Sequence, residues 1–328
     1  MKLRSYVIAA LYAGVAAAPL AASAAAPGPA PYPTRAIRLI VPFTPGGGLD
    51  LQARLIGQQL SERWGQPVIV DNKPGASTIL GTELASRAPA DGYTLLMITT
   101  AFAINPGLHP KLAYDALKDF APVALTASVP LLLVVHPSVP ARTVRELVAL
   151  AKSKPSLLSY ASAGSGTASH VGIELLKTMT GIDMVHIPYK GIPQAFTDLI
   201  AGQVALMGTT PLAAYPYVRA AKLRGLAVGS TKRSAAMPEV PTVAESGVPG
   251  YEASAWQGLV APAGTPDEVI AKLHREVIAI LHTPEVSRKL AADGAELSTI
   301  TPQEFAAYIR NETVKWRKVV QASGARLD

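Results

Sequence analysis

The amino-acid sequence predicts an α/β fold built as two lobes, and three observations lead to this prediction. Short apolar runs of strand character alternate with segments of helical periodicity, several of these runs are apolar from end to end, and about 300 residues follow an N-terminal leader. Such alternation is typical of mostly parallel sheets with helices on both faces, and uninterrupted apolar strands fit burial on both sides. The length favours two domains over one.

The expected strands are short runs of β-branched and other apolar residues. They cover residues 36–43, 67–72, 93–99, 121–127, 131–136, 157–162, 183–189, 203–209, 224–230 and 258–264. Helical spacing of apolar residues predicts helices over 49–64, 78–88, 143–153, 167–180 and 193–201. Only helices are expected after the last strand, over 266–281, 284–293 and 302–322. Each of these begins near a proline, which suits the first helical turn.

No linker of low complexity separates two halves of the chain, so the two lobes are expected to be joined by crossing strands near 128–131 and 226–230. The predicted division assigns residues 32–129 and 229–328, with the C-terminal helices, to the first lobe. Residues 130–228 form the predicted second lobe.

Residues 1–26 have the pattern of a secretory signal peptide. Lys2 and Arg4 precede an apolar stretch over 6–20, and Ala22-Ser23-Ala24 is a small-residue cleavage motif. The alternative is a membrane anchor, but the apolar stretch is shorter than the ~20 residues that a spanning helix needs. We therefore expect export to the periplasm, with cleavage near residues 24–26.

Composition excludes several function classes. The chain has no cysteine, which excludes disulfides and thiol chemistry. Without the leader, 28 basic residues stand against 23 acidic ones, and the basic residues are scattered. A nucleic-acid surface is therefore not expected, whereas a mild attraction for anionic solutes is. The six histidines form no close pair or HExxH motif, so no metal site is expected either.

Two glycine-containing loops follow predicted strands and lead into predicted helices. In open α/β sheets ligands bind at this position, where the N–H groups of a helix N-terminus favour an anion. The alternative is a purely steric role, since glycine-rich turns are frequent in α/β proteins. The first loop offers Phe43, Thr44, Gly46, Gly47, Gly48 and Asp50 as binding residues, and the second offers Ser162, Gly164, Ser165, Thr167 and His170.

The same residues allow other chemistry in principle. Gly164-x-Gly166 lacks the third glycine of a dinucleotide fingerprint, and no phosphate-binding GxxxxGK[ST] motif occurs, so no cofactor is expected. A serine esterase using Ser165 or Ser162 with His170, and Asp198 as a third member, is the alternative function. The G-x-S-x-G turn that such enzymes need is absent, and a histidine that packs at the helix start is the favoured interpretation. A secreted domain that is purely structural or binds a partner protein is a third possibility.

Two roles are possible for Asp50. It can be a base, but in the first turn of a helix its default role is structural, because a carboxylate there is favourable to the helix dipole. An ion pair with Arg54, four residues on, is also expected.

Several motifs together resemble a known family. In order they are "YPTRAIRLIVPFTPGGGLDLQAR", "VDNKPGA", "ADGYTLLM", "YASAGSGTASHVG", "HIPYKG" and "MPEVPTVAESGVPGYEASAWQGLVAPAGTP". From about Tyr32 to the C-terminus, the chain resembles the Bug (TctC-like) family of periplasmic solute-binding proteins, associated with tripartite tricarboxylate transporters.

The resemblance implies a type II periplasmic-binding-protein fold whose two lobes close on a small ligand, without catalysis. It implies a carboxylate ligand, such as an amino acid, an aromatic acid or a di- or tricarboxylate, held by main-chain amides, hydroxyls and waters from the two loops. It also implies delivery to the membrane subunits of a transporter or to a sensor kinase. We expect a monomer. The family's "NKPGAGG" is replaced here by "NKPGASTILG", which puts Ser77 and Thr78 in place of glycines.

Further residues at strand ends are expected to line the cleft. These are Thr100, Ala101, Tyr189, Asp198, Thr209 and Gln257. An apolar wall of the cleft is one interpretation of Phe102, Tyr189 and Trp256. The other is that they belong to the core, as aromatic residues at strand ends more often do. Lys190 is either a positive charge at the rim or an ordinary surface lysine. Neither loop contains an arginine, so only neutral donors are expected to hold the carboxylate.

Overall fold

The computed structural model describes residues 32–109, 111–234, 237–292 and 294–323. The predicted signal peptide, residues 1–26, lies outside the described residues. Among the described helices, none combines the length and the apolar character that a bilayer crossing requires.

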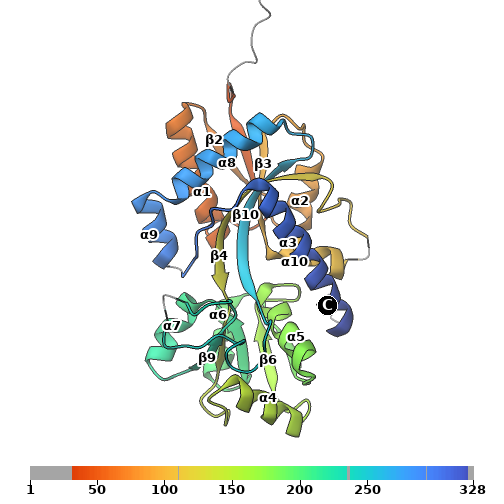
Figure 1. Ribbon diagram of the computed structural model, residues 1–328, viewed down its shortest axis with the longest axis vertical. Helices are drawn as coiled ribbons and strands as arrows, with labels where there is room; N and C mark the ends of the chain where they lie inside the picture. Colours follow the sequence, from red (N-terminus) through yellow and green to blue (C-terminus); the bar gives the residue numbers. More distant parts are fainter. Residues whose placement is uncertain (1–31, 110, 235–236, 293, 324–328) are drawn as a thin grey trace, which may run out of the picture. The chain divides into compact units, whose positions relative to one another are not determined.

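The first sheet contains five strands in the order β2-β1-β3-β10-β4 (Figure 1). Their bounds are β1 Ile37–Val41, β2 Val68–Asn72, β3 Thr94–Thr99, β4 Phe120–Pro130 and β10 Ser254–Pro262. The second sheet has the order β7-β6-β8-β5-β9. Its strands are β5 Leu132–Val135, β6 Ser159–Ser162, β7 Val185–Pro188, β8 Leu206–Thr209 and β9 Arg224–Val228. Eight of these strands fall within the runs that the sequence predicts, whereas β4 and β10 extend beyond theirs. The α/β fold class is confirmed.

The prediction of mostly parallel sheets is confirmed, with one strand in each sheet, β10 or β5, running against the other four. In each sheet the first three strands pair in parallel, and the other two pairings are antiparallel. The physical reason is that the chain must travel between the sheets. The long strands β4 and β10 carry it out of the first sheet and back, so they run in opposite directions next to one another.

The chain passes between the sheets at two places. It leaves the first sheet after Pro130 and enters the second at Leu132, and it returns between Val228 and Ser254. The two passages are hydrogen-bonded to each other, with Gly229 N donating to Leu131 O over 2.6 Å and Leu131 N to Ala253 O over 3.1 Å. A Cβ at Gly229 would lie 2.4 Å from Ala253 O, so only glycine allows this approach of the backbones.

The helices lie on the faces of the sheets. Those predicted from helical spacing are present, as α1 Gly48–Trp64, α2 Ile79–Ser86, α4 Val144–Ser153, α5 Ala168–Thr180, α6 Ile192–Ile200, α8 Asp267–Leu281, α9 Pro284–Ala292 and α10 Pro302–Ser323. Two helices were not predicted, α3 Thr100–Leu108 and α7 Pro211–Arg219. Each contains an internal proline, Pro106 or Pro216, which reads as a helix breaker in the sequence.

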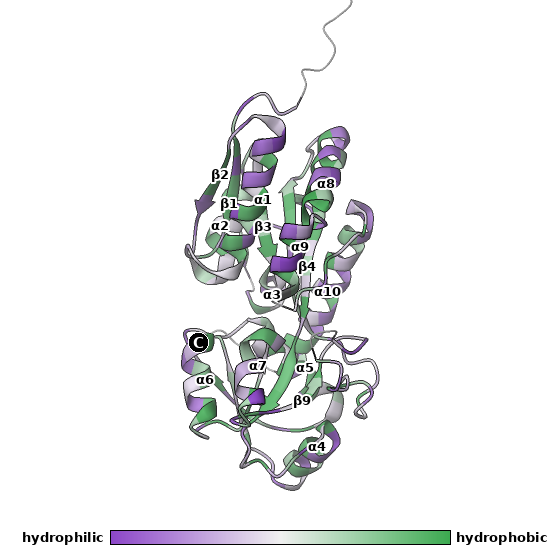
Figure 2. Ribbon diagram, turned by 90° about the vertical axis from the view of Figure 1, so that its left-hand side faces the viewer, coloured by the Kyte–Doolittle hydropathy of each residue, from purple (hydrophilic) through white to green (hydrophobic). Residues whose placement is uncertain are grey.

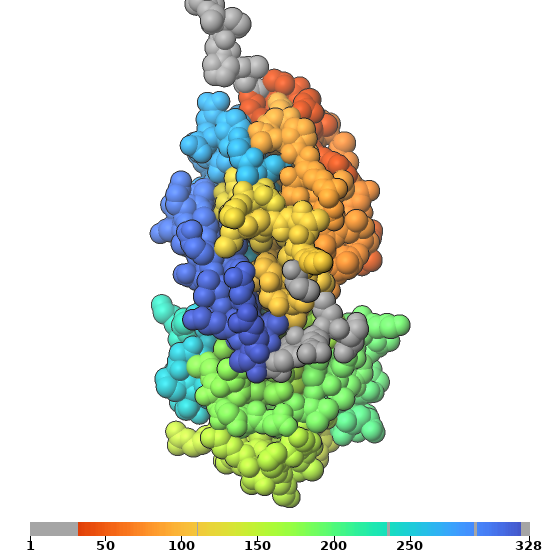
Figure 3. Space-filling view, turned by 90° about the vertical axis from the view of Figure 1, so that its right-hand side faces the viewer, coloured from red at the N-terminus to blue at the C-terminus, as the bar shows by residue number. Residues whose placement is uncertain are grey.

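One apolar cluster extends through α3, α5 and α10. It includes Phe102, Leu108, Leu175, Trp256 and Val319, all buried. In Figure 2 the strands are mainly hydrophobic, whereas the helices carry hydrophilic residues on their outer faces. Helix α10 packs on both α3 and α5, and Figure 3 shows its blue surface adjoining the green surface of the segment that contains α5.

Candidate functional site

The first loop, residues 42–47, connects β1 to α1. Phe43, Thr44, Gly46, Gly47 and Gly48 are exposed. Gly46 has a φ of +85°, a conformation that favours glycine. Leu51 N donates to Gly47 O over 2.9 Å, which closes the first turn of α1. The N–H groups before it have no acceptor within the helix and are directed out of its N-terminus.

The carboxylate of Asp50 holds this loop in place. Its Oδ2 accepts hydrogen bonds from Gly46 N and from Arg54 Nε, both at 2.9 Å, and its Oδ1 accepts one from Asn72 Nδ2 at 2.8 Å. Asn72 Nδ2 also donates to Phe43 O over 3.1 Å. The hydrogen bond from Arg54, helped by those from Gly46 and Asn72, outweighs burial and lowers the pKa of the Asp50 carboxyl to about 2.

The expected ion pair of Asp50 with Arg54 is therefore present. Asp50 is 1% exposed, so its carboxylate acts on the loop from the inside. Asn72 was not predicted as part of the site. It ends β2 in the motif "VDNKPGA", and its register partner is Val41, the residue before the first loop.

The second loop, residues 163–167, connects β6 to α5 and is held by its own hydroxyl groups. Ser169 Oγ accepts from Ala163 N over 3.0 Å, and Thr167 Oγ1 donates to Gly164 O over 2.7 Å. Ser162 is fully buried, and its Oγ accepts from Gly164 N over 3.1 Å. These hydroxyls fix the loop backbone, whereas Gly164, Ser165 and Thr167 are partly exposed.

Two stacked histidines lie beneath the second loop. The His170 and His186 rings have centroids 4.0 Å apart with planes at 9°, and Tyr160 stacks on His186 at 4.8 Å. His170 Nδ1 accepts from Gly166 N over 3.1 Å, which requires the unprotonated nitrogen. Burial, and to a smaller extent the charges of His186 and Lys177, lower the pKa of His170 to about 3.

The serine and histidine that the hydrolase alternative combines have other partners. Ser162 Oγ lies 2.7 Å from His186 Nε2, and His170 is bonded to the loop backbone. The interpretation of His170 as a residue that packs at the helix start agrees with this geometry. His186 was not predicted, although it stands in the quoted motif "HIPYKG".

The remaining predicted lining residues differ in exposure. Thr100 is buried, and its Oγ1 accepts from Trp256 N over 2.9 Å. Ala101 and Gln257 are half-buried, with Gln257 paired to Thr99 across β3 and β10. Thr209 is 2% exposed at the end of β8, and its Oγ1 has no hydrogen-bond partner among the described residues.

Tyr189 and Asp198 form a pair, with the Tyr189 hydroxyl donating to Asp198 Oδ2 over 2.7 Å. Burial and the Asp198 carboxylate raise the pKa of Tyr189 to about 12. Tyr189 N also donates to Ser162 O over 3.1 Å, so this pair begins beside the second loop. Lys190 is exposed.

Of the three aromatics considered as an apolar wall, two belong to the core. Phe102 is 1% exposed and packs edge-on against Phe120. Trp256 is equally buried, and its Nε1 donates to Glu312 Oε2 over 2.9 Å. Phe102 and Trp256 are therefore core residues and do not line the cleft.

The turn at residues 76–78, where the motif "NKPGASTILG" has side chains, has an unusual backbone conformation. Ala76, Ser77 and Thr78 have φ values of 45°, 51° and 80°, three consecutive residues in the left-handed region. Asn105 Nδ2 stabilises this turn by donating to Ser77 O over 2.9 Å and to Thr78 Oγ1 over 3.3 Å. This conformation favours glycine, and the chain adopts it here with residues that carry side chains.

The two loops occupy equivalent positions. Each follows the central strand of the parallel half of its sheet, β1 or β6, and each precedes a helix, α1 or α5. Neither contains lysine or arginine, so each offers main-chain N–H groups and hydroxyls. Such an arrangement can bind an anionic group at each loop. The one serine of the hydrolase alternative seen beside a histidine among the described residues, Ser162 next to His186, is fully buried.

Comparisons with known proteins identify the family of the chain. A family model described as "Tripartite tricarboxylate transporter family receptor" matches residues 52–325. Protein BugT of Bordetella pertussis is 37% identical over 298 residues, covering 90% of this chain and 91% of BugT.

Two solved structures from Rhodopseudomonas palustris are also similar. Rpa4515 with adipate is 38% identical, with a TM-score of 0.77 over 90% of this chain and all of that one. MatC (Rpa3494) with bound malate is 33% identical, with a TM-score of 0.75 over 88% of this chain and all of that one. The chain belongs to the tripartite tricarboxylate transporter receptor family, which includes the Bug proteins and consists of periplasmic solute-binding receptors rather than enzymes.

Proposed function

We propose that this protein captures a small carboxylate between its two lobes and presents it for uptake or sensing. The observation that carries the proposal is the pair of equivalent strand–loop–helix units, β1 to α1 and β6 to α5. The loop of each unit leads into the N-terminus of a helix, where the N–H groups and the helix dipole favour a carboxylate group. Two such units suit a ligand with an acidic group at each end.

Dicarboxylates are the first candidates. The similar structures of Rpa4515 and MatC carry adipate and malate, which both have two carboxylate groups. In our proposal the first loop binds one carboxylate and the second loop the other. Neutral donors keep the affinity moderate, which suits a protein that must also release its ligand.

The proposed setting is the periplasm. The protein would act as a monomer and deliver its ligand either to the membrane subunits of a tripartite transporter or to a sensor kinase. The predicted signal peptide and the family assignment support this setting.

A thermal-shift screen of the mature protein tests the proposal. Adipate, malate, monocarboxylates, tricarboxylates and neutral sugars are compared at equal concentrations. A ligand at ~100 times its dissociation constant adds about 2.7 kcal/mol of stability, enough for a clear rise in melting temperature. If sugars raise the melting temperature and no carboxylate does, the proposal is wrong.

Variants locate the ligand. A Cβ at Gly47 would lie 3.8 Å from its nearest neighbour, Thr44 O, and the Gly47 φ of −77° accepts a side chain. Gly47→Val therefore adds bulk at the first loop without disturbing the fold, and combined with Thr167→Val it should abolish the shift. Gln58→Val, an exposed position on the same helix, is the matched control and should keep the full shift.

A further inference from the structure

A cavity of about 570 Å³ lies at the end of the second sheet away from the second loop. Val135 ends β5 and pairs both with Leu206, the first residue of β8, and with Arg224, the first residue of β9. The second loop follows β6, which runs parallel to β8, so it lies at the opposite end, where Thr209 ends β8. We call this cavity the distal cavity; it is separate from the loops of the proposed function.

Four segments build the distal cavity: the start of β9, the C-terminal part of α7 with the turn after it, residues 137–143 and residues 237–246. Arg224, Gly225 and Leu226 all line it, although successive residues of a regular strand face opposite sides. The register of β9 against β5 shifts between Leu133 and Val134, and such a bulge redirects side chains. The irregular strand therefore directs both a charged and an apolar side chain to one cavity.

The floor of the distal cavity is apolar. Leu223 and Leu226 are 3% and 2% exposed, and Met237 and Val240 come from the opposite segment. The volume falls within the range of about 300–1,000 Å³ that small-molecule sites occupy, and a mostly apolar lining with a few polar groups is typical of them.

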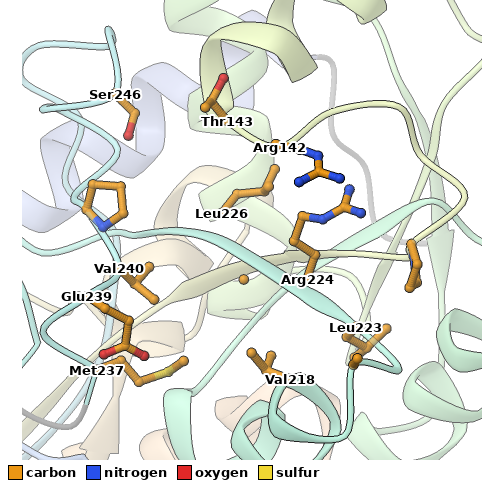
Figure 4. A pocket seen from close by; sticks show the side chains of 14 residues that line it. Arg142, Thr143, Val218, Leu223, Arg224, Leu226, Met237, Glu239, Val240 and Ser246 are labelled. Atoms are coloured by element: carbon orange, nitrogen blue, oxygen red, sulfur yellow. The ribbon is translucent and has the colours of Figure 1, made fainter.

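Two arginines give the cavity a positive side. In Figure 4 the guanidinium groups of Arg142 and Arg224 are drawn on one side of the cavity and the carboxylate of Glu239 on the other. Arg224 Nη1 donates to the carbonyls of Ala141 and Val139, at 2.8 and 3.2 Å. These partners are neutral, so they hold the guanidinium in place without cancelling its charge.

Neither arginine has an acidic partner among the ion pairs of the described residues. The nearest acidic group along the chain, Glu146, accepts a hydrogen bond from the backbone N–H of Arg142 over 2.6 Å. The cavity thus combines an apolar floor, two positive side chains and a single carboxylate, Glu239.

We propose that the distal cavity is a second binding site, for a small anionic amphiphile. The acidic group of the ligand lies against Arg142 and Arg224, and its hydrocarbon part lies on Leu223, Leu226 and Val240. Arginine suits this role because its planar fork binds carboxylates with two parallel hydrogen bonds. The dicarboxylates proposed for the loops carry a second carboxylate at the end that would have to lie on this apolar floor, so they fit the distal cavity poorly.

Isothermal titration calorimetry with octanoate tests the proposal on the mature protein. Octanoate should bind, whereas octanol should bind more weakly because it lacks the charge. Arg142→Gln should weaken octanoate binding about fivefold, the size expected for one partly exposed ion pair. Glu239→Gln should tighten it by a similar factor, because the only carboxylate of the lining repels the ligand.

Two controls separate this site from the loops. Arg145→Gln removes the same charge three residues further along the chain, in the first turn of α4 and outside the cavity lining, and should leave octanoate binding unchanged. Gly47→Val with Thr167→Val should also leave it unchanged, although these substitutions abolish the dicarboxylate shift. The proposal is overturned if octanoate does not bind, if Arg142→Gln and Glu239→Gln have no opposite effects, or if only the loop variant loses binding.

Discussion

The rings of His170 and His186 stack at 4.0 Å beneath the second loop, and His170 Nδ1 accepts the N–H of Gly166. Only the neutral form of His170 can do this, since a protonated imidazole has no acceptor. The hydrogen bond from Gly166 therefore forms only while His170 is unprotonated, as it is at neutral pH. Protonation of His170 would remove this support of the second loop.

The first prediction concerns stability against pH. The pKa of His170 is lowered from 6.5 to about 3 in the folded protein, so between these values the unfolded chain binds a proton that the folded protein does not. The free energy of unfolding should thus fall as the pH drops from 6.5 to 4.5, by about 1.4 kcal/mol per pH unit once the unfolded chain is protonated. Urea unfolding at a series of pH values measures this slope.

His170→Gln should flatten the slope, whatever its effect on the stability at neutral pH. The control is His282→Gln, on the exposed end of α8, which should keep the wild-type slope. An unchanged slope in His170→Gln would show that His170 is not the group responsible. Asp50 contributes little in this range, because its carboxyl in the unfolded chain, with a pKa of 3.8, is still mostly ionised at pH 4.5.

The second prediction concerns the lock on the first loop. Asp50→Ala leaves Gly46 N and Asn72 Nδ2 without their acceptor and Arg54 without its partner, and should lower the free energy of unfolding by about 2–3 kcal/mol. It should also weaken carboxylate binding, because the loop is no longer held. Chemical denaturation and ligand titration measure the two effects.

Asp91→Ala is the matched control for the second prediction. The Arg35–Asp91 pair has nearly the same length, 2.8 Å, but both side chains are exposed, at 62% and 39%. Its loss should cost less than about 1 kcal/mol and leave binding intact. Equal losses from Asp50→Ala and Asp91→Ala would contradict the structural role of Asp50.

The third prediction follows from the left-handed turn at residues 76–78. Ser77 is exposed with a φ of 51°, and Asn105 bonds its carbonyl rather than its side chain. Ser77→Gly should therefore relieve strain and raise the free energy of unfolding by about 1 kcal/mol. Ser153→Gly, at an exposed helical position, should lower it by about 0.5 kcal/mol. A loss of stability in Ser77→Gly would rule out strain at this turn.

Local pattern was enough to find the strands and the two loops, because apolar runs and glycine-containing turns are written in consecutive residues. The local pattern could not predict contacts between residues that are far apart in the sequence. Asp50 pairs with Arg54 as spacing predicts, but Asn72 reaches it through the pairing of β2 with β1. The antiparallel strands likewise follow from the passage between sheets, which no single segment encodes. Helix α3 was missed because Pro106 outweighed its neighbours in the pattern.

The last prediction uses a hydroxyl in an unusual environment. Thr209 Oγ1 is buried at the end of β8 with no partner among the described residues, and a Cβ at the adjacent Gly208 would lie 3.5 Å from Ser169 O in the first turn of α5. A buried hydroxyl without a partner costs free energy, which a methyl group of nearly the same shape does not.

Thr209→Val should therefore raise the free energy of unfolding of the ligand-free protein by about 1 kcal/mol. If the Thr209 hydroxyl donates a hydrogen bond to the carboxylate bound at the second loop, Thr209→Val should bind the dicarboxylate several-fold more weakly. Stability and affinity would then change in opposite directions. Thr209→Ser keeps the hydroxyl and should keep the affinity while losing stability through the missing methyl group. Chemical denaturation measures the stability of both variants, and calorimetry measures their affinity for the dicarboxylate. A Thr209→Val protein that is more stable and binds as tightly as wild type would show that Thr209 does not contact the ligand.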